Sequence, residues 1–170
     1  MEYLFYHACK TGVPFNPHTG VTPDQTLKAL DVHGQPEEVH WPYLPQLPTD
    51  LSKYLPPSMS APVYRRTGQV FANAPVDGIV QELNDNRPSV LVFRSTLQFI
   101  RAGRTSPVAW SSTDQLLTPH AVLAVGLADH QAKRVVRVRN SWGPGWADGG
   151  YAWLTEEYID KTFMALVRME

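Results

Sequence analysis

The segment that decides the fold runs from residue 119 to residue 151 and reads PHAVLAVGLADHQAKRVVRVRNSWGPGWADGGY. Its first part, residues 119–126, is an apolar run of strand length. Proline and glycine bound this run, and a single histidine, His120, stands at its entrance. Such a run predicts a core strand that delivers an imidazole.

The rest of this segment predicts a second strand and a loop. Residues 134–139 alternate in their second half, so that Val136 and Val138 share one face of a strand. A turn at residues 129–131 would pair the two strands as a hairpin, which places Asn140 near the end of the sheet where the histidine enters. Residues 140–146 (NSWGPGW) then predict a loop with apolar cover, because they combine glycine and proline with two indoles.

An asparagine beside a histidine can hold one ring nitrogen by a hydrogen bond. This bond fixes the tautomer and turns the other nitrogen outward. An indole over the bond would exclude water. The same residues are explained equally well by a core histidine with a satisfied hydrogen bond and a tryptophan that fills space. Spacing alone leaves both interpretations open.

The pattern His-Ala-Val-x-x-Val-Gly followed by Arg-Asn-Ser-Trp-Gly-x-x-Trp-x-x-x-Gly-Tyr resembles the C-terminal half of papain-family cysteine peptidases. The resemblance implies that His120 is the catalytic histidine, that Asn140 orients it and that Trp142 covers their bond. It also implies an α+β, papain-like fold with a helical left lobe and a β-barrel-like right lobe. The loop that follows matches the family at Gly143, Trp146, Gly150 and Tyr151.

Three features depart from the family's pattern. Pro119 stands where the family has a small or acidic residue, and Ala147 stands where it has glycine. The largest departure is that no Gln-x-x-x-x-x-Cys-Trp segment, which carries the family's nucleophile, is present. The sequence has one cysteine, Cys9, in residues 3–12 (YLFYHACKTG), which resemble the helix after the family's cysteine helix. We therefore expect an incomplete left lobe and no nucleophile at Cys9; the alternative is that Cys9 is a repositioned nucleophile for His120.

The resemblance implies two parts. Residues 1–62 correspond to a partial helical left lobe and a proline-rich crossing segment, and residues 63–170 to a β-rich right lobe with the His/Asn site. Residues 42–62 contain six prolines interleaved with aromatic and aliphatic residues. This composition predicts an ordered crossing segment, and the alternative is a polyproline II ligand. Residues 37–43 (EEVHWPY) resemble a turn of bacterial papain-like proteins.

Local patterns predict the remaining elements. A capping box at Thr22 and Gln25 starts a helix whose buried side holds Leu27, Leu30 and Val32. The other predicted elements are helices at 2–10 and 76–86, strands at 89–94, 151–154 and 163–167, and a turn at 156–158.

Glu37 and His40 have the spacing of some helical metal ligands. The prolines at 36 and 42 argue against a helix there, so we predict neither a metal nor a cofactor.

Composition limits the classes of partner. The chain of 170 residues has a formal charge of −1 and an apolar content of 43%, which indicates an ordered globular protein without a nucleic-acid or membrane partner. A single cysteine permits no internal disulfide, and the N-terminus lacks the features of a signal peptide. We expect a cytoplasmic location, and export by a specialised route stays open.

The expected function follows from the resemblance and from the missing nucleophile. The chain would be a papain-like peptidase homologue that is inactive alone: a remnant, a truncated form or a half-enzyme. Its partners would be a peptide or protein in the interlobe cleft, and a second chain or copy that covers the left lobe. The alternative is a non-catalytic binding, immunity or scaffold module.

Overall fold

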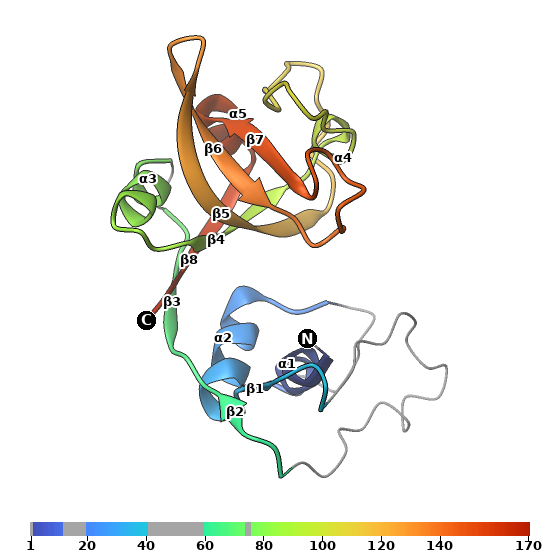
Figure 1. Cartoon of the computed structure of the whole chain (residues 1–170), viewed down its shortest axis with the longest axis vertical. Helices are drawn as coiled ribbons and strands as arrows, with labels where there is room; N and C mark the ends of the chain where they lie inside the picture. The colour runs from blue at the N-terminus through green and yellow to red at the C-terminus, as the bar shows by residue number, and fades with distance from the viewer. Residues whose placement is uncertain (1, 12–19, 41–59, 74–75) are drawn as a thin grey trace. The chain divides into compact units, whose positions relative to one another are not determined.

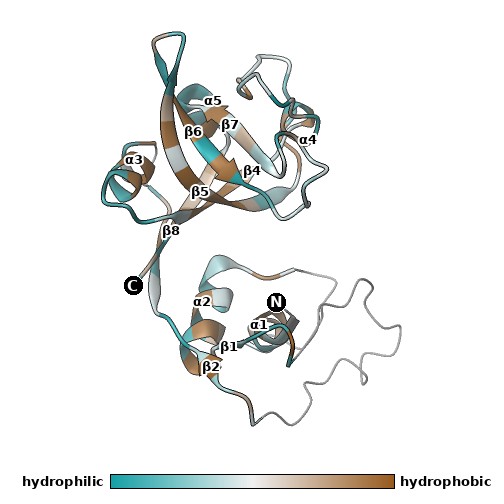
Figure 2. Cartoon of the chain, viewed as in Figure 1, coloured by the Kyte–Doolittle hydropathy of each residue, from teal (hydrophilic) through white to brown (hydrophobic). Residues whose placement is uncertain are grey.

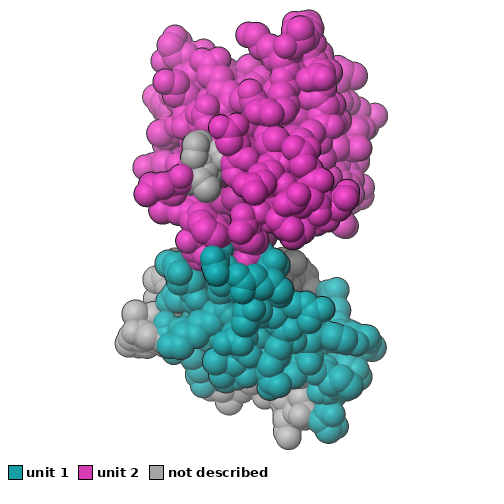
Figure 3. Space-filling model, turned by 90° about the vertical axis from the view of Figure 1, so that its left-hand side faces the viewer, with its two compact units in different colours: residues 1–69, 169–170 teal, residues 70–168 magenta. Residues whose placement is uncertain are grey.

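The computed structural model describes residues 2–11, 20–40, 60–73 and 76–170 (Figure 1). The chain forms two compact units, residues 1–69 with 169–170 and residues 70–168 (Figure 3). The predicted crossing segment at 42–62 lies outside the described residues except for its last three positions. The expected lobe boundary after residue 62 stays a prediction.

The first unit contains a helix pair and a small sheet. Its elements are α1 (Glu2–Cys9), α2 (Pro23–Val32), β1 (Gln35–Pro36) and β2 (Val63–Tyr64). The two helices pack against each other, and β1 pairs antiparallel with β2. The side chains buried in the helix pair are Tyr6, Ala8, Cys9 and Ala29.

The sequence predicted the start of α2. The N–H of Gln25 donates to the Thr22 hydroxyl at 3.3 Å, and the Thr22 N–H donates to Gln25 Oε1 at 2.8 Å, which confirms the capping box. The prediction that Val32 is buried is wrong, since its side chain is 53% exposed. Leu30 and Val32 are two residues apart and point roughly 200° apart around a helix, so they do not share a face.

The second unit is built on a six-stranded sheet with the strand order β3-β8-β4-β5-β6-β7. The strands are β3 (Gly68–Phe71), β4 (Ser89–Arg94), β5 (Pro119–His130), β6 (Lys133–Arg139), β7 (Tyr151–Thr155) and β8 (Phe163–Met169). The helices are α3 (Val76–Asn84), α4 (Leu97–Ile100) and α5 (Glu156–Thr162). The antiparallel β5–β6 hairpin confirms the predicted strand pair.

The core of the second unit follows from alternation along the strands (Figure 2). Val136 and Val138 are fully buried, as predicted, and lie in one cluster with residues from β4, β5, β7 and α5. The largest fully buried side chains of these four elements are Leu91, Phe93, Leu154, Tyr158 and Ile159. This core holds the start of β5 and the end of β6 in place, and these are the strand ends that carry His120 and lead into Asn140.

The turn predicted at residues 156–158 is wrong, because a helix, α5, forms there. The Thr155 hydroxyl caps it by accepting the Tyr158 N–H at 3.2 Å, and two glutamates occupy its first turn. Tyr158, Ile159 and Thr162 are buried at helical spacing. None of the helices in the described ranges combines the length and the apolar composition that a membrane crossing requires.

Candidate active site

Strand pairing brings the predicted histidine and asparagine together. His120 is the second residue of β5 and lies opposite Phe93 of β4, while Asn140 directly follows β6. The pairing of Leu123 with Arg139 places the end of β6 beside the beginning of β5. The Asn140 N–H donates to the Gly150 carbonyl at 2.9 Å, which ties the loop after β6 to the start of β7.

A hydrogen bond of 2.9 Å joins His120 Nε2 to Asn140 Oδ1. The same Oδ1 accepts the backbone N–H of Ser141 at 2.8 Å. Because a backbone N–H can only donate, this side-chain atom must be the amide oxygen, and Nε2 of His120 must carry the hydrogen. In the neutral ring, Nδ1 therefore keeps its lone pair and is the nitrogen available for proton transfer.

Aromatic side chains surround the His120 ring. The Trp142 ring lies 4.7 Å from it, centroid to centroid, and the Phe99 and Phe93 rings lie at 5.6 and 6.0 Å. Phe93 and Phe99 are fully buried, whereas Trp142 is 43% exposed. The histidine ring therefore packs against two buried phenylalanine rings and one partly exposed indole.

The loop that carries Trp142 is fixed by a second indole and by a glycine. The Trp146 Nε1–H donates to the Ile100 carbonyl at 3.1 Å, and the Trp146 ring packs on Phe99 at 5.0 Å. Gly150 has a φ of +94°, and a Cβ there would lie 3.2 Å from a backbone oxygen, so only glycine fits without strain. Ala147 also has a positive φ, of 43°, which explains why glycine suits this position.

A family model described as "Papain family cysteine protease" matches residues 9–165. The chain belongs to the papain family. A cysteine protease of Blomia tropicalis is 24% identical over 132 residues, which cover 76% of this chain and 38% of that protein. Papaya proteinase 4 of Carica papaya is 50% identical over 32 residues, 19% of this chain and 9% of that protein. The chain therefore spans less than half the length of these papain-family relatives.

Solved structures agree with the papain family. Xylellain, a cysteine protease from Xylella fastidiosa, superposes with a TM-score of 0.74 at 26% identity, covering 99% of this chain and 68% of that one. Procathepsin B S9 from Trypanosoma congolense gives a TM-score of 0.71 at 16% identity, covering 99% and 59%. These likenesses confirm the predicted α+β, papain-like fold. The individual roles of His120, Asn140 and Trp142 stay predictions.

The one cysteine of this papain-family chain lies in α1 of the first unit. Cys9 is 3% exposed and forms no disulfide, and burial raises the pKa of its thiol. A buried thiol with a raised pKa is neutral and unreactive. Glu37, which the spacing pairs with His40, instead accepts a hydrogen bond from the Tyr64 hydroxyl at 3.2 Å.

Sequence reasoning missed Phe93 and Phe99 as neighbours of His120. Phe93 was assigned to a buried strand, but its contact with His120 depends on the β4–β5 register. Phe99 lies on α4, a short helix capped by Thr96, whose hydroxyl accepts the Phe99 N–H at 3.3 Å. The sequence Thr-x-x before an aromatic residue was the available signal for this helix.

Proposed function

We propose that this chain carries the histidine–asparagine part of a papain-type peptidase site and does not cleave peptides by itself. A papain-type reaction needs a thiolate nucleophile, an imidazole that exchanges a proton with the leaving amine, and a group that orients the ring. Asn140 holds Nε2 of His120, so Nδ1 faces the position of a reacting group. The assembled His120–Asn140 pair beneath Trp142 is the observation that carries the proposal.

The state of Cys9 supports inactivity of this chain. It is the single cysteine of the sequence, it is buried in α1, and its thiol pKa is raised. Without a thiolate, His120 has no acid–base partner to activate. Removing the nucleophile of a catalytic triad lowers turnover by about a million-fold, so the histidine and asparagine alone give negligible hydrolysis.

A second function, a non-catalytic module that binds a peptide or protein, is favoured by exposed apolar side chains on α4, the helix whose Phe99 packs on His120, and on the loop after β6. Leu97 and Ile100 of α4 are 51% and 41% exposed, and Trp142 is 43% exposed. Large apolar side chains gathered beside a site mark contact surfaces more often than isolated ones do. Both functions share the same ligand class, a peptide or protein segment that passes His120.

Thiol labelling tests the first function. The purified chain, its His120→Ala variant and free cysteine react with an epoxide probe for papain-type thiols, and intact mass follows the adduct. We expect Cys9 to react no faster than free cysteine, and equally in both proteins, while a fluorogenic peptide stays uncleaved. Fast labelling that disappears in His120→Ala would contradict the proposal and establish Cys9 as a nucleophile.

Peptide binding separates the two functions. If the chain is a binding module, a labelled peptide keeps its affinity in His120→Ala but loses it when Leu97 and Ile100 are both changed to serine. If the surface is only a substrate site, the His120→Ala change weakens binding as well. Fluorescence anisotropy measures both affinities without any need for turnover.

A further inference from the structure

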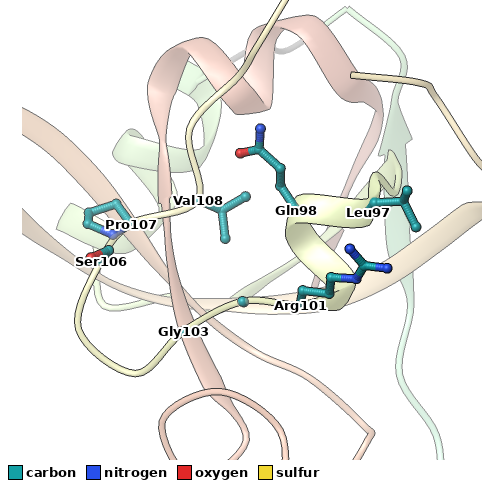
Figure 4. A pocket seen from close by; sticks show the side chains of 8 residues that line it. Leu97, Gln98, Arg101, Gly103, Ser106, Pro107 and Val108 are labelled. Carbon is teal, nitrogen blue, oxygen red and sulfur yellow. The ribbon is translucent and has the colours of Figure 1, made fainter. Parts of the chain in front are cut away.

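A hollow of about 340 Å³ lies between α4 and the loop that follows it (Figure 4). The helix lines it with Leu97 and Gln98, Arg101 follows directly after the helix, and the opposite wall contains Ser106, Pro107 and Val108. Its volume is within the range of about 300–1,000 Å³ that is typical of small-ligand sites. His120, Asn140 and Trp142 are not among the residues that line this hollow.

The far wall of the hollow is held in place by the sheet. The Val108 N–H donates to the Trp153 carbonyl at 2.8 Å, and the Thr155 N–H donates to the Val108 carbonyl at 3.0 Å. These two bonds attach the loop to β7. The hollow is therefore formed before any ligand binds, which lowers the entropic cost of binding.

The hollow adjoins the candidate active site through α4. Phe99 of this helix packs on both His120 and Trp142, while Leu97 and Gln98 of the same helix line the hollow. Four helical residues extend over only about 6 Å. A peptide that passes His120 along this side can therefore place a nearby side chain in the hollow.

Arg101 gives the hollow its charge. It is the one charged residue in the lining, its side chain is exposed, and it has no ion-pair partner among the described residues. Other arginines of this unit are engaged: Arg134 with Glu156, and Arg137 with Asp148. A guanidinium without a carboxylate beside it, at a preformed hollow, is available to an incoming anion.

The remaining lining specifies which anion fits. Gln98 and Ser106 offer further hydrogen-bond donors, and Pro107 and Val108 offer apolar surface for methylene groups. Figure 4 shows the side chains of Gln98, Arg101 and Ser106 on different sides of the hollow, so the charge of an incoming anion falls to Arg101 alone. A carboxylate on a short aliphatic stem, the side chain of glutamate or aspartate, suits one guanidinium beside an apolar wall. We propose that the hollow is a subsite for an acidic residue of the bound peptide, with Arg101 as its specificity-determining residue. This inference rests on the proposed function in one respect: it takes from it that the ligand is a peptide.

Matched peptides test the subsite on the full chain. Fluorescein-labelled nonapeptides of alanine and glycine with a central leucine carry one glutamate, moved through each other position, and each has a glutamine counterpart. We expect one glutamate position to bind about fivefold tighter than its glutamine match at low salt, and less so at high salt. Arg101→Gln should remove this difference. Arg104→Gln, a change at an exposed arginine outside the lining, should retain it.

The outcomes separate the subsite from the proposed function. Equal binding of every glutamate and glutamine pair, or a preference that persists in Arg101→Gln, overturns the subsite and leaves peptide binding at His120 intact. If no peptide of either kind binds, the peptide ligand is wrong and the subsite falls with it. Amide chemical shifts of Gly103 and Ser106 provide a direct check, because they should move with the glutamate peptide in the unmodified chain and stay unchanged in Arg101→Gln.

Discussion

At the scale of single residues, the orientation of His120 depends on one oxygen atom. Asn140 Oδ1 accepts both the histidine Nε2–H and the Ser141 N–H, while the buried Nδ2 of Asn140 has no hydrogen-bond partner in the described part of the chain. An unpaired buried N–H costs about 1–3 kcal/mol. The structure tolerates this cost in an arrangement that engages Nε2 of the histidine and leaves Nδ1 without the hydrogen in the neutral ring.

Replacing Asn140 with alanine should release the ring. The change removes the acceptor of two hydrogen bonds but also the unpaired Nδ2, so we expect a net loss of about 1 kcal/mol or less in the free energy of unfolding. We also expect the neutral His120 ring to change from one tautomer, protonated at Nε2, to a mixture. Nitrogen chemical shifts of the ring, measured by NMR, report the tautomer directly.

Ser141→Ala is the matched control, because the backbone N–H that donates to Oδ1 remains. This variant should keep the Nε2–H tautomer. A mixture of tautomers in Ser141→Ala, or a single tautomer in Asn140→Ala, would contradict the role of the Asn140 oxygen.

The sequence was sufficient to predict His120, Asn140 and Trp142 as neighbours. Asn140 and Trp142 lie in one local motif, and the predicted hairpin places this motif beside His120. The sequence was not sufficient for Phe99, whose contact with His120 requires the position of α4 relative to β5. Such contacts depend on register and packing between elements, and neither is encoded in a short window of sequence.

At the scale of elements, a buried carboxylate joins α3 to β8. Glu82 is fully buried; it pairs with Arg87 Nε at 2.9 Å and with Arg168 of β8. The hydrogen bond from Arg87 holds the pKa of the Glu82 carboxyl below its usual range, and the charge of Arg168 acts in the same direction against the effect of burial. The ionised form of Glu82 therefore stabilises the packing of α3 against β8.

This ion cluster predicts a loss of stability in acid. Because the pKa of Glu82 is lower in the folded than in the unfolded chain, its contribution is complete above the unfolded value of about 4.3 and is lost as pH falls through the folded value. Glu82→Gln should lower stability at neutral pH and flatten the stability curve below about pH 5. Urea unfolding between pH 7 and pH 3 measures both effects.

Glu157→Gln, at an exposed position of α5, serves as the control for this curve. It should leave the acid dependence of the unmodified chain nearly unchanged. If Glu82→Gln and Glu157→Gln gave the same curve, the buried cluster would not be the source of the acid sensitivity.

The helix pair of the first unit contains a second group with a shifted pKa, the imidazole of His7. The rings of His7 in α1 and His33 after α2 stack at 3.8 Å between centroids. Burial, followed by the charges of His33 and Lys10, lowers the pKa of His7 to about 4. The rings of Tyr3 and Tyr6 also contact His7.

Since the folded pKa of His7 is below the unfolded value of about 6.5, the unfolded chain binds more protons between these values. The helix pair should therefore lose stability as pH falls from about 6.5 to 4. Because the intrinsic exchange rate of amides itself falls with pH, the quantity to compare is the protection factor. The protection of α1 amides should decrease over this range in the unmodified chain and not in His7→Gln. His130→Gln, at an exposed position of the β5–β6 hairpin, should behave like the unmodified chain.

The elements differ in how well sequence predicted them. The capping box of α2 and the apolar run of β4 are local signals, and both elements appear where predicted. The helix α5 was missed because it has only seven residues, and its two glutamates resemble a polar turn. The burial of its Tyr158 and Ile159 depends on packing against the sheet, which the local sequence does not specify.

At the scale of the whole molecule, the papain-family match spans residues of both units. The first unit contains Cys9, the single cysteine of the sequence, and the second contains His120, Asn140 and Trp142. Each unit has buried side chains of its own. Because Cys9 and His120 belong to different units, the role of Cys9 has to be tested on the whole chain.

If Cys9 is a packing residue, replacing it should affect the first unit alone. Cys9→Ala removes a small buried side chain, so we expect a loss of about 1 kcal/mol, and Cys9→Ser should cost more because it buries a hydroxyl. Faster hydrogen exchange should be confined to residues 2–11 and 20–34, and the β5–β6 hairpin should be unchanged. Peptide affinity should match that of the unmodified chain in both variants. A loss of affinity in Cys9→Ala, without faster exchange in α1, would instead place this thiol in the binding site beside His120.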